Sequence, residues 1–548
     1  MKNKLLTPSD LGLDPKHFPV FRTVQTEVME FLNTSPTRVT GACVPTGAGK
    51  TAICAAVAVQ FVRRTKQRVV ILVATKAQQE EYTKYFSSLL VSVTGKANYT
   101  CVGVPGTHTC KSGGLEGCPH FGEPTCLYDS ARDIARNANI VVTNYAYWLR
   151  LNSMPNSPGL CIGEEGTIMN PFGLLIMDEA DTSFEQLAGS MHVEIHEANI
   201  TSLGVLSSRT TLNDSLSAWV TLAKDNLTAA DSMRSEQVKR YKRNKAPYVR
   251  ELVRRLEGLC EAFESIQGMD EASWICESHG DHGHRKFTFD AVWPGMRAES
   301  RLFLGIPQVF MLSATLRRKT MGLLGLKAGS YSFKEWPRVF PKERSPVYRM
   351  PGASMSGRRI TDAGLRNWVS TIDKIIDARL DRKGIIHTSS YARQQYLVEN
   401  SRHAVLFHVN KSEAGSPTSV VVADGFRAAK EPAILVSPSF TTGWNFPGRE
   451  CEYQIIAKVP FKRMDKVNKA RAERDPGYSA YATMQEIVQM CGRGMRFPLD
   501  RCETFIVDDD FDWFYKQARA SAPEWFEYRL ITKLPMLPER APETKGDA

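Results

Sequence analysis

The stretch 38–62, RVTGACVPTGAGKTAICAAVAVQFV, joins a β-rich run to an alanine-rich run through the turn PTGAGKT. Glycines in this turn permit backbone conformations in which successive N–H groups point at one phosphate chain. The helix that we expect next adds the positive end of its dipole. The sequence therefore predicts a strand, a phosphate-binding loop and a helix. The loop would comprise Pro45, Thr46, Gly47, Ala48, Gly49, Lys50 and Thr51.

Two side chains of this loop have expected roles. The Lys50 ammonium would reach the β- and γ-phosphates of ATP, and the Thr51 hydroxyl would bind magnesium. Val44 stands where the usual pattern G-x-x-x-x-G-K-[ST] begins with glycine. A glycine-rich turn with a chance Lys-Thr is the alternative, and the strand–loop–helix context argues against it.

A second motif, FGLLIMDEAD, ends an apolar run with two acids. Asp178 would hold the magnesium directly or through water, and Glu179 would be the base that orients the attacking water. Acids at the carboxyl end of a strand lie where open α/β sheets bind ligands. A helix N-terminus enriched in acids is the simpler explanation, but it does not account for the pairing with the loop. Together the two motifs predict ATP hydrolysis.

Two later motifs add polar groups in the same order along the chain. QVFMLSATLRR places Ser313, Ala314 and Thr315 after another apolar strand, and MQEIVQMCGRGMRF contains Gln489, Arg493 and Arg496. Arginines three apart share one helix face, so both could point at a triphosphate across a cleft. A guanidinium from a second domain stabilises charge on a transferring phosphoryl group. An arginine pair on a solvated helix face is the alternative.

With these motifs the chain resembles the XPD/DinG family of iron–sulfur helicases, within helicase superfamily two. FRTVQ is similar to the family's R-x-x-Q element, and GKANYTC to its G-R-x-N-Y-x-C element. NIVVTNYAYWL, AKVPFKRMDKVNKARAE and QMCGRGMR resemble its I-V-V-T-N-H, K-L-P-F and Q-x-x-G-R-x-x-R segments. The H-R-x-G-R-x-x-R and P-T-R-E-L motifs of DEAD-box RNA helicases are missing from the sequence. The resemblance extends from about residue 21 to 511.

The resemblance implies an α/β fold with two RecA-like domains and ATP bound between them. It places Arg22 and Gln25 near the adenine, and Asp181, Ser313, Ala314, Thr315 and Gly443 among the residues that couple ATP to nucleic acid. It also implies translocation from 5′ to 3′ on single-stranded DNA and unwinding of forked duplex. Two departures are visible: DEAD replaces DEAH at Asp181, and Trp444-Asn445 replaces Val-Asp. We expect both to affect coupling rather than hydrolysis.

A cluster of thiols interrupts the first of these domains. Cys101, Cys110, Cys118 and Cys126 are a third of the chain's 12 cysteines and lie in one Gly- and Pro-rich stretch. A reducing compartment disfavours disulfides. Zinc is an open alternative, because His108 and His120 lie among the thiols, although tight C-x-x-C knuckles are missing from this stretch. Four thiolates on a long loop also suit a [4Fe–4S] cluster, which the family carries at this position.

The bulk composition sets further limits. The sequence has 548 residues, too many for one core, so we expect two to four domains. We find no signal peptide and no apolar run of membrane-spanning length, and we expect a cytoplasmic monomer without a membrane partner. The net charge of +11 suggests a polyanionic partner but does not identify one. The basic runs KRYKRNK and FKRMDKVNKARAER predict either phosphate contacts or solvated helix faces.

The expected domain boundaries follow from the motifs. The first RecA-like domain would comprise residues 15–94, 130–182 and 286–335. The cluster insertion would span 95–129, and a mostly helical arch insertion 183–285, supported by helical spacing in APYVRELVRRLEGLCEAFESI. The second RecA-like domain would span 336–535, followed by a disordered tail at 536–548.

Three functions are compatible with these motifs. An ATP-dependent DNA helicase is the interpretation that the resemblance favours. An RNA or RNA–DNA hybrid helicase would use the same machinery, and an ATP-gated clamp would grip nucleic acid without unwinding it. The intact Glu179 argues against the clamp.

Overall fold

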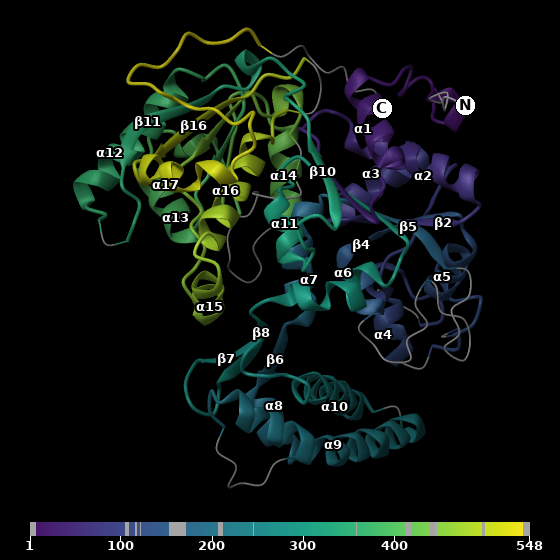
Figure 1. Cartoon of the computed structure of the whole chain (residues 1–548). Helices are drawn as coiled ribbons and strands as arrows, with labels where there is room; N and C mark the ends of the chain where they lie inside the picture. Colours follow the sequence, from purple (N-terminus) through teal and green to yellow (C-terminus); the bar gives the residue numbers. More distant parts are fainter. Residues whose placement is uncertain are drawn as a thin grey trace.

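Two parallel sheets form the frame of the computed structural model (Figure 1). It describes residues 7–104, 109–115, 118–120, 122–152, 160, 171–205, 212–244, 246–357, 359–410, 418–438, 444, 446–495 and 499–540. Each sheet has seven strands and belongs to one α/β domain. A third sheet, antiparallel and three-stranded, belongs to an insertion in the first domain. The predicted fold class, two RecA-like domains with two insertions in the first, is confirmed.

The first α/β domain has the strand order β10-β1-β9-β5-β2-β4-β3. Its strands are β1 (Val39–Cys43), β2 (Arg68–Val73), β3 (Val91–Ser92), β4 (Ile140–Asn144), β5 (Phe172–Asp178), β9 (Gln308–Ser313) and β10 (Tyr331–Glu335). Its main helices are α1 (Thr23–Thr34), α2 (Lys50–Thr65), α3 (Lys76–Phe86), α6 (Tyr145–Leu151), α7 (Ser183–Met191) and α11 (Arg318–Leu323).

Apolar residues alternate between the two faces of this sheet. Ile71, Ile176 and Leu312 pack against α1, α2 and α3 on one face. Leu175 and Met311 pack against α6, α7 and α11 on the other. Burial on both faces explains why these strands read as continuous apolar runs in the sequence.

The second α/β domain has the strand order β13-β14-β12-β15-β16-β11-β17. Its strands are β11 (Val347–Ala353), β12 (Gly384–His387), β13 (Phe407–Val409), β14 (Ile434–Ser437), β15 (Tyr453–Ile456), β16 (Glu503–Asp508) and β17 (Arg529–Leu530). Its helices are α12 (Asp362–Asp377), α13 (Tyr391–Asn400), α14 (Ser419–Ala428), α15 (Lys466–Arg474), α16 (Tyr478–Cys491) and α17 (Asp510–Ala518). Residues 536–540, which we expected in a disordered tail, are described, and the Arg540 guanidinium pairs with Glu452 at 2.6 Å.

The insertion at residues 192–292, which we call the arch, combines helices with a small sheet (Figure 1). Its elements are β6 (Val193–His196), α8 (Glu197–Leu203), α9 (Leu216–Asn244), α10 (Pro247–Ile266), β7 (Trp274–His279) and β8 (Lys286–Ala291). The predicted helix over the APYVRELVRRLEGLCEAFESI run is α10. The sheet order β6-β8-β7 places β8 in the arch, so the expected boundary at 285 falls inside one sheet.

The Cys-rich segment lies between β3 and β4, next to α5 (Leu127–Asn137), and contains the short helix α4 (Cys110–Leu115). In the described part of the chain, no helix is long and apolar enough to cross a membrane.

Candidate nucleotide site between the two sheets

The phosphate-binding loop follows β1, as predicted, and α2 begins at Lys50. Gly47 and Gly49 have φ angles of 74° and 80°, which residues other than glycine rarely adopt. A Cβ at Gly49 would also lie 2.4 Å from the Gln25 amide nitrogen. The loop therefore requires glycine at position 49 for two independent reasons.

Arg22 and Gln25 contact the backbone of this loop. The Arg22 guanidinium donates to the Gly47 carbonyl at 2.7 Å, and the Gln25 amide donates to the Ala48 carbonyl at 3.0 Å. Gln25 is buried and also accepts from the Arg22 N–H at 2.9 Å. In this structure the two side chains therefore stabilise the backbone conformation of the loop through its carbonyl groups.

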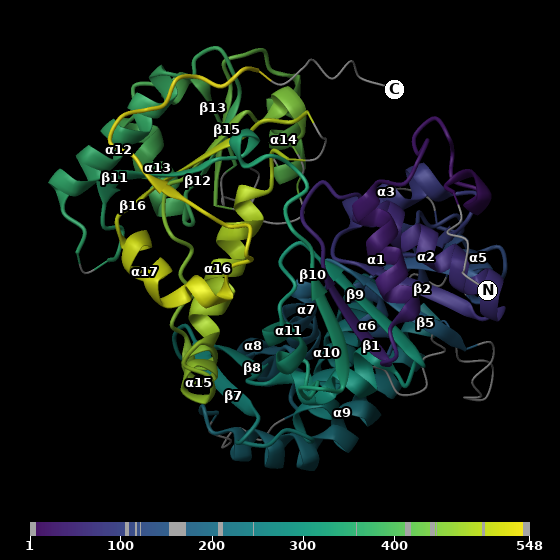
Figure 2. The same ribbon diagram turned by 45° about the horizontal axis from the view of Figure 1, so that its top comes forward.

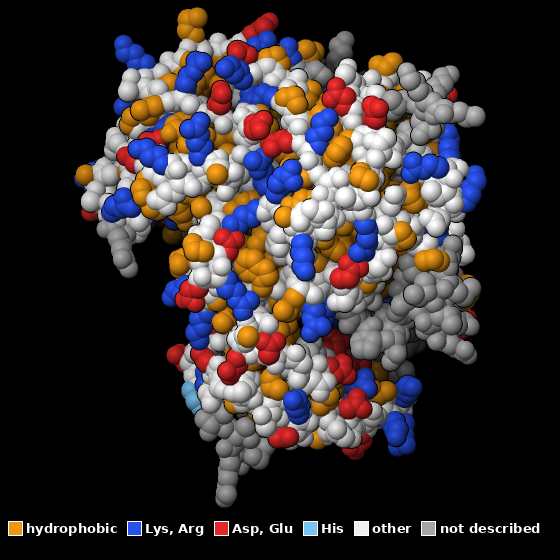
Figure 3. All heavy atoms as spheres, in the orientation of Figure 1, with side chains coloured by type: hydrophobic (Ala, Val, Ile, Leu, Met, Phe, Trp, Pro, Cys, Tyr) orange, Lys and Arg blue, Asp and Glu red, His pale blue; other side chains and the backbone are white. Residues whose placement is uncertain are grey.

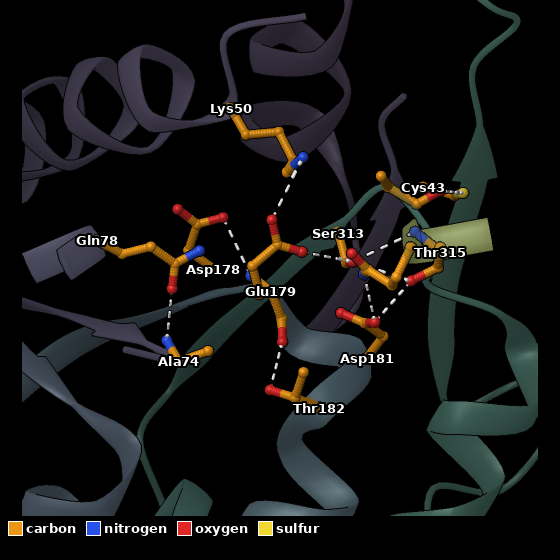
Figure 4. Close-up of polar contacts among 12 residues, drawn as sticks. Cys43, Lys50, Ala74, Gln78, Asp178, Glu179, Asp181, Thr182, Ser313 and Thr315 are labelled. Atoms are coloured by element: carbon orange, nitrogen blue, oxygen red, sulfur yellow. Dashed lines mark hydrogen bonds and ion pairs between the residues drawn. The ribbon is translucent and has the colours of Figure 1, made fainter. Parts of the chain in front are cut away.

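Acidic residues at the end of β5 meet the loop (Figure 4). The Lys50 ammonium lies 3.6 Å from Glu179 Oε1, and the Ser313 hydroxyl donates to Glu179 Oε2 at 3.0 Å. Glu179 has a φ of 51°, a left-handed conformation uncommon for residues other than glycine. Such strain is concentrated at functional sites, where the surroundings hold it in place.

Asp178 directly precedes Glu179 and is almost fully buried. The Tyr82 hydroxyl donates to Asp178 Oδ2 at 3.0 Å, and the Tyr145 hydroxyl donates to the Asp178 carbonyl at 3.2 Å. Burial, together with the charge of Glu179, raises the pKa of Asp178 to about 6. The two tyrosines were missing from our sequence predictions, because no motif spacing connects them to Asp178.

Asp181 connects the two α/β domains. Its Oδ2 accepts from the Thr315 hydroxyl at 2.6 Å and from the Gln489 amide at 2.9 Å, and that amide also contacts Thr315 Oγ1 at 3.0 Å. Burial, together with the charge of Glu179, raises the pKa of Asp181. Gln489 belongs to α16 of the second domain, so one carboxylate binds a residue from each side of the cleft.

Arg493 enters the cleft from the second domain. Its Nη1 donates to the Trp444 carbonyl at 2.6 Å, and burial lowers the pKa of its guanidinium to about 10. We expected Arg493 and Arg496 on one helix face, and this is wrong for Arg493, because α16 ends at Cys491 and Arg493 lies in the following turn. Arg496 and Gly443 lie outside the described residues.

A cavity of about 750 Å³ lies between the domains at this point. The loop and the acidic motif line one side, and Gln489, Gly492 and Arg493 line the other. A Cβ at Gly492 would lie 2.9 Å from Thr46 Cγ2, so the two domains are already close here. Among the other predicted residues, Pro45 and Ala48 are buried in the loop, and Thr51 is in the first turn of α2. The Ala314 carbonyl accepts a hydrogen bond from the Cys43 thiol at 3.3 Å.

The four predicted thiols of the Cys-rich segment come together. The Sγ atoms of Cys110 and Cys126 are 3.9 Å apart, and Cys101 is within hydrogen-bonding reach of Cys118. All four are buried and none forms a disulfide. A Cβ at Gly113 would lie 2.2 Å from Cys101 Sγ, so glycine leaves room for the thiols.

These thiols match the donor set of an iron–sulfur cluster, which binds through four thiolates. Among the described residues, however, no group of three or more His, Cys, Asp or Glu side chains is arranged to hold a metal ion. His120 hydrogen-bonds Thr125 through Nδ1 at 2.7 Å, and His108 lies outside the described residues.

Comparison with known proteins identifies the two α/β domains. A family model described as DEAD/DEAH box helicase matches residues 22–212, and one described as helicase C-terminal domain matches residues 375–529. The chain therefore contains a DEAD/DEAH box helicase domain and a helicase C-terminal domain. It is an ATP-hydrolysing enzyme of the nucleic-acid helicase class, as predicted.

Solved structures agree on the fold of this helicase. A structure described as an XPD helicase matches with a TM-score of 0.61 and 13% identity, covering 93% of this chain and 98% of that one. A structure described as apo XPD gives a TM-score of 0.60 and 13% identity, with coverage of 93% and 100%. A structure of S. cerevisiae Dbp5 bound to RNA and ADP BeF3 gives a TM-score of 0.46 and 10% identity, covering 96% of this chain and 95% of that one. The first two matches show that the helicase has the XPD-like fold.

Proposed function

We propose that this helicase translocates on single-stranded DNA and unwinds forked duplex, using ATP hydrolysed between its two α/β domains. The observation that carries the proposal is the Asp181 junction. One buried carboxylate binds Thr315 of the first domain and Gln489 of the second, and it lies two residues from Glu179. We therefore expect a change in the bound nucleotide to alter the hydrogen bonds of Asp181 at the contact between the domains.

The proposed chemistry assigns one role to each side chain. Lys50 would contact the β- and γ-phosphates, and Thr51 and Asp178 would hold magnesium, which would supply positive charge to the phosphates. Glu179 accepts a proton from the attacking water and orients it, while Ser313 fixes one oxygen of its carboxylate. Arg493 stabilises charge on the phosphoryl group from the second domain. Arg22 and Gln25 keep the loop in its phosphate-binding shape.

The nucleic-acid partner and the direction of translocation have separate support. The positive net charge supports a polyanionic partner. On the face drawn in Figure 3, however, Lys and Arg side chains are mixed with Asp and Glu, so charge does not trace a path across it. The direction from 5′ to 3′ rests on the family resemblance.

Parallel assays test the proposal. ATP hydrolysis should rise more with single-stranded DNA than with RNA, and a 5′-tailed duplex should be separated faster than a 3′-tailed one. Stimulation by RNA alone would favour the RNA helicase. Lys50→Ala and Glu179→Gln should abolish hydrolysis and strand separation together. Hydrolysis without separation of any fork would favour the ATP-gated clamp.

We further propose that Cys101, Cys110, Cys118 and Cys126 hold a [4Fe–4S] cluster, with zinc as the alternative. The support is the burial of four thiols in one place beside the first domain. Protein purified without oxygen should be brown and contain iron and sulfide, and Cys110→Ser should lose both. Cys260→Ser, which replaces a buried arch thiol, is the matched control. A colourless protein with bound zinc would contradict the cluster.

A further inference from the structure

Arg471 of α15 has an environment that its sequence does not suggest. It belongs to the basic run FKRMDKVNKARAER, where we expected phosphate contacts or a solvated face. The side chain is instead 7% exposed. Its Nε donates to the Val292 carbonyl at 3.0 Å, and its Nη2 donates to the Ala291 carbonyl at 3.1 Å. These two residues are the point at which the chain returns from the arch.

The same guanidinium binds the segment that leads into the arch. Its Nη1 lies 3.4 Å from Glu185 Oε2 on α7. The guanidinium carbon Cζ lies 5.2 Å from the ring centroid of Phe184 and 5.6 Å from that of Tyr478. The Tyr478 hydroxyl also donates to Glu185. One side chain of the second domain therefore contacts the chain both just before it enters the arch and where it leaves the arch.

Other contacts extend this junction. The Lys466 ammonium at the start of α15 lies 2.8 Å from Asp214 of the arch, and α15 lies beside β7 in both views (Figure 2). Towards the first domain, Lys319 pairs with Asp475 at 2.7 Å, and the hydroxyls of Thr320 and Tyr481 are 2.6 Å apart. The arch is thus joined to the first domain by the chain itself and by an ion pair of Arg150 with Glu261 at 3.0 Å, and to the second domain by non-covalent contacts alone.

We infer that Arg471 fastens the arch to the second α/β domain, so that a nucleotide-driven movement of this domain carries the arch with it. Arg471 is a positioning residue with no part in the chemistry. Its planar fork of donors matches two carbonyls and a carboxylate at once, which a lysine cannot do. Loss of the fork would leave the Ala291 and Val292 carbonyls without these donors, and buried unpaired groups are costly. The inference rests on the proposed function only in requiring nucleotide-driven domain movement.

Energy transfer between two dyes tests the inference. Genetically encoded amino acids at the exposed positions Glu30 of α1 and Ser232 of α9 would carry the dyes, leaving every cysteine intact. Transfer is compared between protein saturated with a non-hydrolysable ATP analogue and with ADP. In the unsubstituted chain we expect it to differ between the two nucleotides. Arg471→Leu should lose most of this difference while binding both nucleotides as before. Arg474→Leu, an exposed arginine on the same helix, should keep it.

The outcomes separate this inference from the proposed function. An unchanged difference in Arg471→Leu would overturn it, as would the same transfer with both nucleotides in the unsubstituted chain. Neither result affects the choice between DNA and RNA, because no nucleic acid is present. If Arg471→Leu does not fold, Arg471→Lys decides in the same way: a reduced difference supports the inference and an unchanged one contradicts it. A chain that binds neither nucleotide would contradict the inference and the proposed function together.

Discussion

Tyr82 illustrates how a residue outside every motif can determine the geometry of the site. Its hydroxyl donates to Asp178 Oδ2, and its side chain is 1% exposed. Burial, together with the charge of Asp178, raises the pKa of Tyr82, so the hydroxyl keeps its proton and acts as a donor. Partners of this kind orient metal ligands and tune their affinity.

Tyr82→Phe should weaken magnesium binding without unfolding the domain. We expect the magnesium concentration that gives half-maximal tight binding of ATP to rise about tenfold, as for other substitutions behind a metal ligand. Titration of a fluorescent ATP analogue against magnesium measures this without hydrolysis. Tyr85→Phe on the same helix is the control, because its ring is only partly buried and no hydrogen bond from its hydroxyl to Asp178 is seen. Equal effects of the two substitutions would show that Tyr82 does not position Asp178.

At the scale of elements, the parallel strands and the motifs at their ends could be predicted from the sequence. Apolar runs such as LLIM in β5 are buried on both faces, and a polar residue at a strand end marks the ligand edge. The contacts between Asp181 and Gln489 could not be predicted, because they are 308 positions apart and depend on how two domains meet. The third strand of the arch sheet, β6, was missed for a similar reason, since it pairs with β8, almost 100 residues later.

The sequence HGDHGH, at residues 279–284, lies at the tip of the hairpin formed by β7 and β8. Glu197 at the start of α8 fastens it: Oε2 accepts from the Gly283 N–H at 2.8 Å, and Oε1 accepts from Arg285 Nη2 at 2.9 Å. The hydrogen bond with Arg285 lowers the pKa of Glu197 to about 2. The pair is largely buried.

Glu197→Gln should destabilise the arch by about 3 kcal/mol, because it leaves a buried guanidinium without its carboxylate. The lowered pKa means that the carboxylate stabilises the fold above pH 4.5, and that this contribution is lost as the pH falls towards 2. Chemical denaturation monitored by tryptophan fluorescence measures the change. Glu251→Gln removes an exposed pair with Arg254 and should cost well under 1 kcal/mol. Similar costs for both would contradict the assigned role of Glu197.

His387 at the end of β12 adds a pH dependence to the second domain. It is fully buried, and burial, together with the charge of Arg493, lowers its pKa to about 4. In the unfolded chain the pKa of a histidine is about 6.5. Between pH 6.5 and pH 4 the unfolded chain therefore binds a proton that the folded chain does not. The free energy of unfolding should therefore fall by about 3 kcal/mol between pH 6.5 and pH 4. Thermal unfolding across this range should show a weaker dependence in His387→Gln. Parallel curves for the two proteins would contradict the assignment.

For the molecule as a whole, the proposed mechanism makes hydrolysis depend on how closely the two domains approach. Gly492 lies against Thr46 of the phosphate-binding loop, where a Cβ would be 2.9 Å from Thr46 Cγ2. A methyl group there must push the domains apart or displace the loop. Misplacements of about 1 Å cost up to about 100-fold in rate.

Gly492→Ala should therefore lower the rate of ATP hydrolysis by about tenfold. Gly425→Ala on α14 is the matched control, because a Cβ there meets nothing within 4 Å. Steady-state hydrolysis at saturating ATP measures both. Full activity of Gly492→Ala would mean that the domains have more room than the structure shows.

The pairing of β6 with β8 has a consequence for the modular design of the enzyme. Val193 and Phe289 are direct partners in this antiparallel ladder, so the chain enters and leaves the arch at adjacent positions. The Cα atoms of these two partners are about 5 Å apart, a gap that a turn of a few residues closes. We therefore expect that the residues between them can be exchanged or removed as one unit, while α7 and the acidic motif before it keep their places in the first domain.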